Sequence, residues 1–121
     1  MKPLVLILMA LTLAASPAVA GLKVLGEGDN RSFDASTFPA DKQASYKLME
    51  SKCAVAECHG LGRAVDAVVT GTAQISQTPF DKEAAKKYGV KMMRMPNSGI
   101  DKAEAKELVE LMYFLIDESG R

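Results

Sequence analysis

Both cysteines and the single histidine of this chain lie within seven consecutive residues. They are Cys53, Cys58 and His59, with four residues between the two thiols and none between the second thiol and the imidazole. Two thiols can add to the vinyl groups of a haem, and an imidazole that follows the second thiol can bind the iron. The usual attachment motif has two residues between the cysteines, so residues 54–57 must bulge for both sulfurs to reach one porphyrin edge.

Four other uses of these groups compete with covalent haem. A structural disulfide accounts for the thiols but leaves the position of the only histidine to chance. A zinc site needs a fourth ligand, and a redox-active dithiol normally has two intervening residues and lies at the start of a helix. Copper remains the alternative, because soft sulfur ligands suit Cu(I) and three nearby methionines could supply thioethers. We expect one covalent haem c, with a periplasmic copper-binding carrier as the second hypothesis.

The absence of a second histidine excludes bis-histidine ligation of iron within one chain. A methionine thioether is then the natural second axial ligand, and three candidates are close together: Met92, Met93 and Met95. They precede Pro96 and follow Gly89, where the sequence predicts the end of a helix. Two further methionines, Met49 and Met112, lie on apolar helix faces and are expected to fill the core.

Residues 1–20 have the pattern of a secretory signal peptide. Lys2 gives a short charged start, the apolar run 4–15 follows, and small residues precede Gly21. The apolar run is too short to span a bilayer, so we expect cleavage after Ala20, a periplasmic location and no membrane span in the mature chain. The remaining residues suffice for one small domain that gains stability from a bound group.

The elements that must position these groups are helical. We expect an irregular or extended lead segment over 21–38, in which Phe33 and Phe38 contact the rest of the protein. A first helix from residue 39 or 41 to residue 52 runs into the cysteine motif. Residues 65–78 are predicted to be loop with one short helix, followed by a helix capped by Thr78, with Pro79 in its first turn.

The last helix has the clearest start. Asp101 and Glu104 have the spacing of a capping box, and an apolar stripe follows. The stripe consists of Ala105, Leu108, Leu111, Met112 and Leu115. No alternating strand pattern is present, so the sequence predicts an all-α fold.

From residue 40 to residue 116 the chain resembles the class I c-type cytochromes. The resemblance rests on a helix entering Cys53, Cys58 and His59, on the segment Met95–Pro96, and on the acid-started final helix. It implies a cytochrome c-like haem domain over 39–121, in which the N- and C-terminal helices cross around one covalently bound haem. It also implies that Cys53 and Cys58 form the thioethers, that His59 is the proximal ligand and that Met95 is the distal one, with Met93 and Met92 as alternatives.

Two features depart from that family. The cysteine spacing is one, although some sites of tetrahaem cytochromes resemble it. The other is the first helix, where Ser45 and Met49 replace the usual glycine and aromatic at the crossing, so Tyr113 or Phe114 is expected to supply the aromatic bulk.

The resemblance implies a one-electron carrier between redox partner proteins and no enzymatic activity. A haem-based sensor of a gas or peroxide is a further alternative if the distal methionine is labile. The 15 basic and 15 acidic residues balance, which gives no general affinity for nucleic acid. The basic stretch from Lys82 to Arg94 could dock an acidic partner. We expect a monomer.

Overall fold

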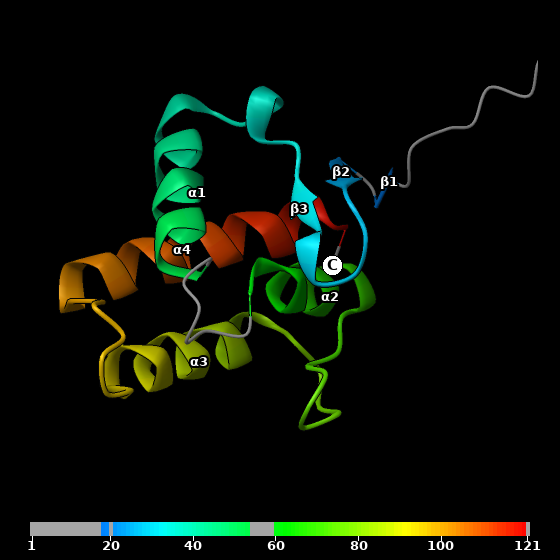
Figure 1. The fold of residues 1–121 in the computed structure, drawn as a ribbon. Helices are drawn as coiled ribbons and strands as arrows, with labels where there is room; N and C mark the ends of the chain where they lie inside the picture. Colours follow the sequence, from blue (N-terminus) through cyan, green and yellow to red (C-terminus); the bar gives the residue numbers. More distant parts are fainter. Residues whose placement is uncertain (1–17, 20, 54–59, 121) are drawn as a thin grey trace, which may run out of the picture.

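The computed structural model describes residues 18–19, 21–53 and 60–120 of the chain. Four α-helices dominate this part, namely α1 (Ala40–Cys53), α2 (Leu61–Thr70), α3 (Lys82–Arg94) and α4 (Lys102–Glu118). The prediction of a mainly helical protein is therefore confirmed. Figure 1 shows α4 in the middle of the molecule, where α1 and α3 both pack against it. None of the helices in the described ranges combines the length and hydrophobicity that crossing a membrane requires.

Helix α4 begins as the sequence predicts. The Asp101 carboxylate accepts a hydrogen bond from the Glu104 N–H at 2.8 Å, which satisfies one of the unpaired donors of the first turn. The predicted stripe of Ala105, Leu108, Leu111, Met112 and Leu115 is buried, and Leu111 and Leu115 are among the most enclosed side chains. Helices α1, α2 and α3 all pack against α4.

Helix α1 packs across α4 at Ser45, whose hydroxyl donates to a Glu107 carboxylate oxygen at 3.0 Å. This polar pair lies at position 45, where a glycine would allow the two helices to approach more closely. Aromatic bulk comes from Phe114, whose ring meets that of Phe38 edge to face at 5.1 Å between centroids. Helices α1 and α4 thus pack against each other, and Phe114 of α4 contacts Phe38, which precedes α1.

Helix α3 differs from its prediction at both ends. Its N-cap is Asp81, whose carboxylate accepts from the Ala84 N–H at 2.8 Å, so Thr78 and Pro79 lie before the helix. The helix does not end at Gly89, which is buried within it. A Cβ atom at that position would collide with Cγ2 of Val109 on α4. The glycine therefore allows close helix packing instead of ending the helix.

Helix α2 is the least anticipated helix. The sequence predicted a loop with one short helix over residues 65–78, whereas the helix covers residues 61–70. Gly71 ends it in a left-handed conformation with φ of 72°, and its N–H donates to the Ala67 carbonyl. Val65 and Val68 of this helix are fully enclosed in the core.

The lead segment is folded onto the helices. It contains β2 (Leu22–Leu25), the 3-10 turn η1 (Gly28–Asn30), β3 (Ser32–Phe33) and the 3-10 turn η2 (Ala35–Thr37). Strand β2 pairs antiparallel with β3 and also with β1 (Ala18–Val19), which gives a small sheet in the order β1-β2-β3. The sequence did not predict these strands, which are too short to show alternation. Phe33 and Phe38 are both buried, as expected.

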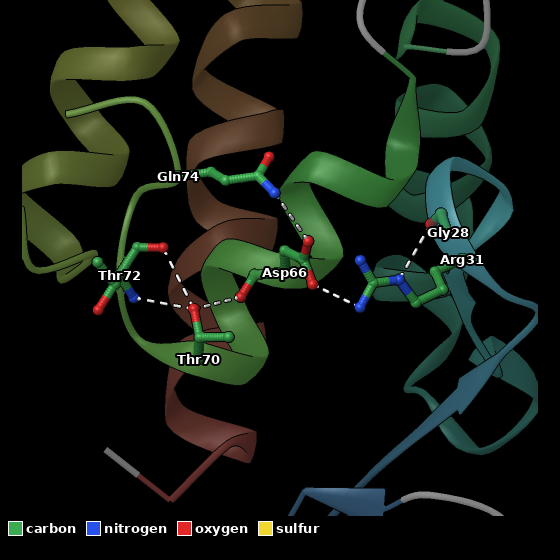
Figure 2. A network of polar contacts seen from close by, with 6 residues as sticks. All are labelled: Gly28, Arg31, Asp66, Thr70, Thr72 and Gln74. Carbon is green, nitrogen blue, oxygen red and sulfur yellow. Dashed lines mark hydrogen bonds and ion pairs between the residues drawn. The ribbon is translucent and has the colours of Figure 1, made fainter. Parts of the chain in front are cut away.

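Turn η1 lies directly against the start of α2. A Cβ atom at Gly62 would come within 2.7 Å of the Gly28 carbonyl oxygen and 2.8 Å of Asp29 backbone atoms, so only glycine allows this approach. Figure 2 shows the polar network that closes the contact, in which Arg31 donates to the Gly28 carbonyl at 3.0 Å and pairs with Asp66 of α2. Asp66 also accepts from Gln74.

The start of β2 is tied to the other end of the molecule. The Gly21 N–H donates to the Glu118 carbonyl at 3.1 Å, in the last turn of α4. Leu22, the next residue, is buried in the same core as Leu115 and Ile116. Residues 21–38 thus bind to α1, α2 and α4 and do not act as a tether.

Candidate functional site

Cys53 is the last residue of α1. It continues the helix face on which Tyr46 and Met49 are buried, because residues spaced by three and four lie on one side of a helix. Its side chain is half-buried and packs against the edge of the core. The helix thereby holds the first thiol of the motif at the boundary between core and solvent.

The other two motif residues, Cys58 and His59, lie outside the described residues. The chain is described again from Gly60, and Leu61 packs against the core as the first residue of α2. The contact between Gly62 and η1 fixes the start of that helix. Both flanks of the segment 54–59 are therefore held by packed helices.

The three candidate methionines do not share one environment. Met92 and Met93 belong to the last turn of α3 and are half-buried, so the prediction that they lie beyond the end of the helix is wrong. Met95 is the C-cap, with an extended backbone (φ −66°, ψ 134°), and its side chain is 55% exposed. Pro96 explains where the helix stops, because proline disfavours helical geometry in the residue before it.

Residues 95–100 form a tight turn between α3 and α4. The Ser98 N–H donates to the Met95 carbonyl at 3.2 Å, and the Ser98 hydroxyl donates to the Met93 carbonyl at 3.4 Å. The same hydroxyl accepts from the Ile100 N–H at 3.3 Å. Asn97 adopts a left-handed backbone with φ of 61°, which asparagine tolerates better than most residues. We call residues 95–100 the Met95 turn.

Lys52 connects the end of α1 to the Met95 turn. Its ammonium group donates to the Gly99 carbonyl at 2.6 Å and forms an ion pair with the Glu104 carboxylate at 3.0 Å. Because Cys53 is the next residue, this contact brings the start of the cysteine motif beside the turn that carries Met95. Two parts of the chain that are far apart in sequence thus meet at one corner of the molecule.

Two titratable groups near this corner have shifted pKa values. Hydrogen bonding from the Glu104 backbone lowers the pKa of Asp101, with Lys52 acting in the same direction. On α1, burial raises the pKa of Tyr46 to about 12. The Tyr46 hydroxyl accepts a hydrogen bond from the Phe33 N–H at 2.7 Å, so this tyrosine anchors β3 to α1 and stays protonated at neutral pH.

The donor atoms at this corner suit haem attachment. A half-buried thiol at a helix end and an exposed thioether in the Met95 turn are the kinds of sulfur group that covalent attachment and axial ligation of a haem use. The apolar side chains of Leu61 and Ile100 also pack at the edge of the core. These features fit the haem assignment.

The same positions fit copper less well. Met92 and Met93 are neighbours on a helix, so their side chains diverge by roughly 100° about its axis. A site with all three methionine sulfurs would require α3 to unwind at its end. Within the described ranges, no group of three or more His, Cys, Asp or Glu side chains is placed to hold a metal ion.

The basic stretch 82–94 coincides with α3, and its cations lie on the outer face of that helix. Two of its cations are paired, Lys82 with Asp117 at 2.8 Å and Lys87 with Glu83 at 3.0 Å. The other three form no ion pair within the described part of the chain, and they are Lys86, Lys91 and Arg94. Val90, 37% exposed, has Lys86 and Arg94 as neighbours at a helical spacing of four residues.

Sequence reasoning missed the residues that join the two halves of the site. The sequence predicts only a helix end at Lys52, a loop at Gly99 and a cap at Glu104, and not the contacts among them. A lysine immediately before the first cysteine was the available signal, but its partners are more than forty residues away in the chain. The close approach at Gly62 had no sequence signal beyond the glycine itself.

Comparison with known proteins adds no assignment. No protein-family model, no curated protein and no solved structure matches this chain.

Proposed function

We propose that this protein is an exported c-type cytochrome with one haem, which carries single electrons between partner proteins in the periplasm and is not an enzyme. Cys53 and Cys58 would hold the haem as thioethers. His59 would be the proximal iron ligand and Met95 the distal one, with Met93 and Met92 as alternatives. The haem supplies one reversible electron, and a thioether opposite an imidazole raises the reduction potential relative to two imidazoles.

The observation that carries this proposal is the Lys52 contact. It joins the residue before Cys53 to the Met95 turn at 2.6 Å, which supports a site shared by the end of α1 and this turn. Met95 is favoured over Met92 and Met93 because it alone lies in the turn, where a side chain can reorient without unwinding α3. Its 55% exposure leaves the sulfur accessible to a ligand on that side.

The outer face of α3 is the docking surface that this function needs. Lys86 and Arg94 flank the exposed Val90, Lys91 is exposed on the same helix, and α3 leads directly into the Met95 turn. Exposed cations beside a small apolar side chain favour rapid and reversible association with an acidic partner protein. Reversal of charge at Lys86, Lys91 and Arg94 should therefore slow electron transfer and weaken its dependence on salt.

The first experiment is the intact mass of the protein purified from the periplasm, with a pyridine haemochrome assay. We expect a polypeptide that starts at Gly21, a mass increase of one haem and a spectrum of two thioether links. A mass equal to that of the bare polypeptide refutes the proposal. Copper in the same sample would transfer the assignment to a copper carrier.

The distal ligand is tested by substitution of single methionines with leucine. A ferric Met-ligated haem has a far-red sulfur-to-iron band, and we expect its loss in Met95→Leu only. Met49→Leu is the matched control, because Met49 is buried in the core on α1 and is not a candidate ligand. Retention of the band in Met95→Leu with loss in Met93→Leu or Met92→Leu would reassign the ligand. A high-spin ferric spectrum of the unmodified protein would instead support a sensor with an open position on iron.

A further inference from the structure

We infer that Lys52 is a positioning residue that holds the Met95 turn closed against the end of α1 and thereby limits access of other ligands to the distal side of the iron. The inference rests on the proposed function, because the distal ligand is part of it. Its structural part concerns only described residues, namely Lys52, Glu104 and the Met95 turn.

The geometry of Lys52 is that of a cross-link. Its ammonium group donates a hydrogen bond to the Gly99 carbonyl at 2.6 Å and forms an ion pair with the Glu104 carboxylate at 3.0 Å. The side chains of Lys52 and Glu104 are 27% and 26% exposed, so the pair is partly shielded from water and salt. The attraction between these two charges is therefore screened less by salt than that of a fully exposed pair.

The Met95 turn transmits this contact to Met95. Ser98 bonds back to the carbonyls of Met95 and Met93, and Ile100 bonds to Ser98. Gly99 lies between Ser98 and Ile100, so the carbonyl held by Lys52 belongs to the same hydrogen-bonded unit. The turn must therefore move as one piece, and release of Gly99 frees the piece that carries Met95.

The other end of the cross-link is fixed. Lys52 lies in the last turn of α1, whose inner face is buried through Tyr46 and Met49. Glu104 belongs to the first turn of α4, and Asp101 caps that turn. The lysine thus holds a short turn against two packed helices, and loss of its side chain should affect the turn before it affects the helices.

The test compares Lys52→Leu with Lys47→Leu and Lys52→Arg. Lys47 lies on the exposed side of the same helix without an ion pair in the described part of the chain, so its variant loses the same charge without the cross-link. Arginine keeps donors for both partners. The measurements are the affinity of the ferric protein for imidazole, which competes with the methionine, and the amide exchange rates of Ser98 and Ile100 by NMR.

We expect Lys52→Leu to bind imidazole about tenfold more tightly and to exchange the Ser98 and Ile100 amides about tenfold faster, which corresponds to about 1.4 kcal/mol for opening of the turn. Lys47→Leu should stay within about twofold of the unmodified protein, because isolated surface charges contribute little. Lys52→Arg should restore both values. A lysine that merely stabilised the fold would lower the melting temperature and leave imidazole affinity unchanged.

Two failures are distinguishable. If the unmodified protein contains no haem, the proposed function fails and the inference falls with it. If the protein contains haem and Lys52→Leu binds imidazole as the unmodified protein does, the inference is overturned and the proposed function stands.

Discussion

The contact between Gly62 and turn η1 gives the sharpest prediction about stability. In Gly62→Ala, the new methyl group would lie 2.7 Å from the Gly28 carbonyl oxygen and 2.8 Å from Cα and O of Asp29. All three atoms are backbone, so no side-chain rotation relieves the collision. Turn η1 must move away from α2, which disturbs the Arg31 contacts with Gly28 and Asp66 shown in Figure 2.

The magnitude follows from two opposing terms. Overpacking of this kind costs about 1–3 kcal/mol. Alanine gains up to about 1 kcal/mol over glycine in the interior of a helix, and less here because residue 62 is in the first turn of α2. We expect a net loss of about 1–2 kcal/mol in the free energy of unfolding, or roughly 5–15 °C in melting temperature for a domain of this size.

The assay is thermal and urea unfolding of the whole protein, with amide exchange of Asn30 and Arg31 as the local measurement. Both N–H groups donate within η1, so they should exchange faster when the turn is displaced. Arg63→Ala is the control, since Arg63 is in the same helical turn and its side chain makes no hydrogen bond or ion pair in the described structure. A Gly62→Ala variant as stable as the unmodified protein would refute the close approach.

Three further predictions concern α1, α3 and α4. Tyr46→Phe should destabilise by about 1–3 kcal/mol, because the buried Phe33 N–H loses its acceptor. The unmodified protein should also lose stability as the pH rises from about 10 to about 12, because folded Tyr46 keeps a proton that the unfolded chain releases, and Tyr46→Phe should lack this loss. Gly89→Ala should destabilise by about 1 kcal/mol through its collision with Val109, and Val109→Ala in the same chain should relieve part of that loss in a double-mutant cycle. Asp101→Ala should lower the melting temperature at neutral pH, and the difference should shrink in acid because the lowered pKa of Asp101 makes its stabilising effect vanish as the carboxylate is protonated.

These predictions have separate contradicting results. An unchanged alkaline unfolding curve in Tyr46→Phe would show that another group titrates there. Additive losses in the Gly89→Ala and Val109→Ala pair would place the collision elsewhere. A pH-independent effect of Asp101→Ala would show that the carboxylate charge does not contribute to the cap.

The helices that the sequence predicts well are those whose signals are local. Asp101 caps α4 through a residue three positions away, and the stripe that follows is amphipathic. Helix α1 was expected to end at Lys52 and ends one residue later. In each case the residues that specify the element lie within it.

The errors arise where distant residues decide. Gly89 predicts the end of a helix, yet it lies within α3. Its role depends on Val109 of α4, which occupies the space that a side chain at residue 89 would fill. Strands β2 and β3 are specified by pairing with each other and by the Tyr46 hydroxyl, thirteen residues from Phe33, and neither signal shows in a short segment. The meeting of Lys52 with Gly99 is equally non-local.

For the candidate site, the sequence specified the types of donor atoms, and the structure adds the surroundings of some of them. Cys53 and Met95 are described, and the Lys52 contact links their neighbourhoods. Cys58 and His59 lie outside the described residues, so their roles remain predictions of the motif. Haem content is therefore the measurement on which the functional proposal depends.

The hydrogen bond between Gly21 and Glu118 joins the start of β2 to the last turn of α4. If β2 opened independently, only its own amides would be exposed. Here, opening of β2 also removes the Gly21 N–H donor from the Glu118 carbonyl in the last turn of α4. The two elements should therefore open as one cooperative unit in hydrogen exchange, with similar free energies for Leu22 and Ser119. Proteolysis within either element would then require both to open.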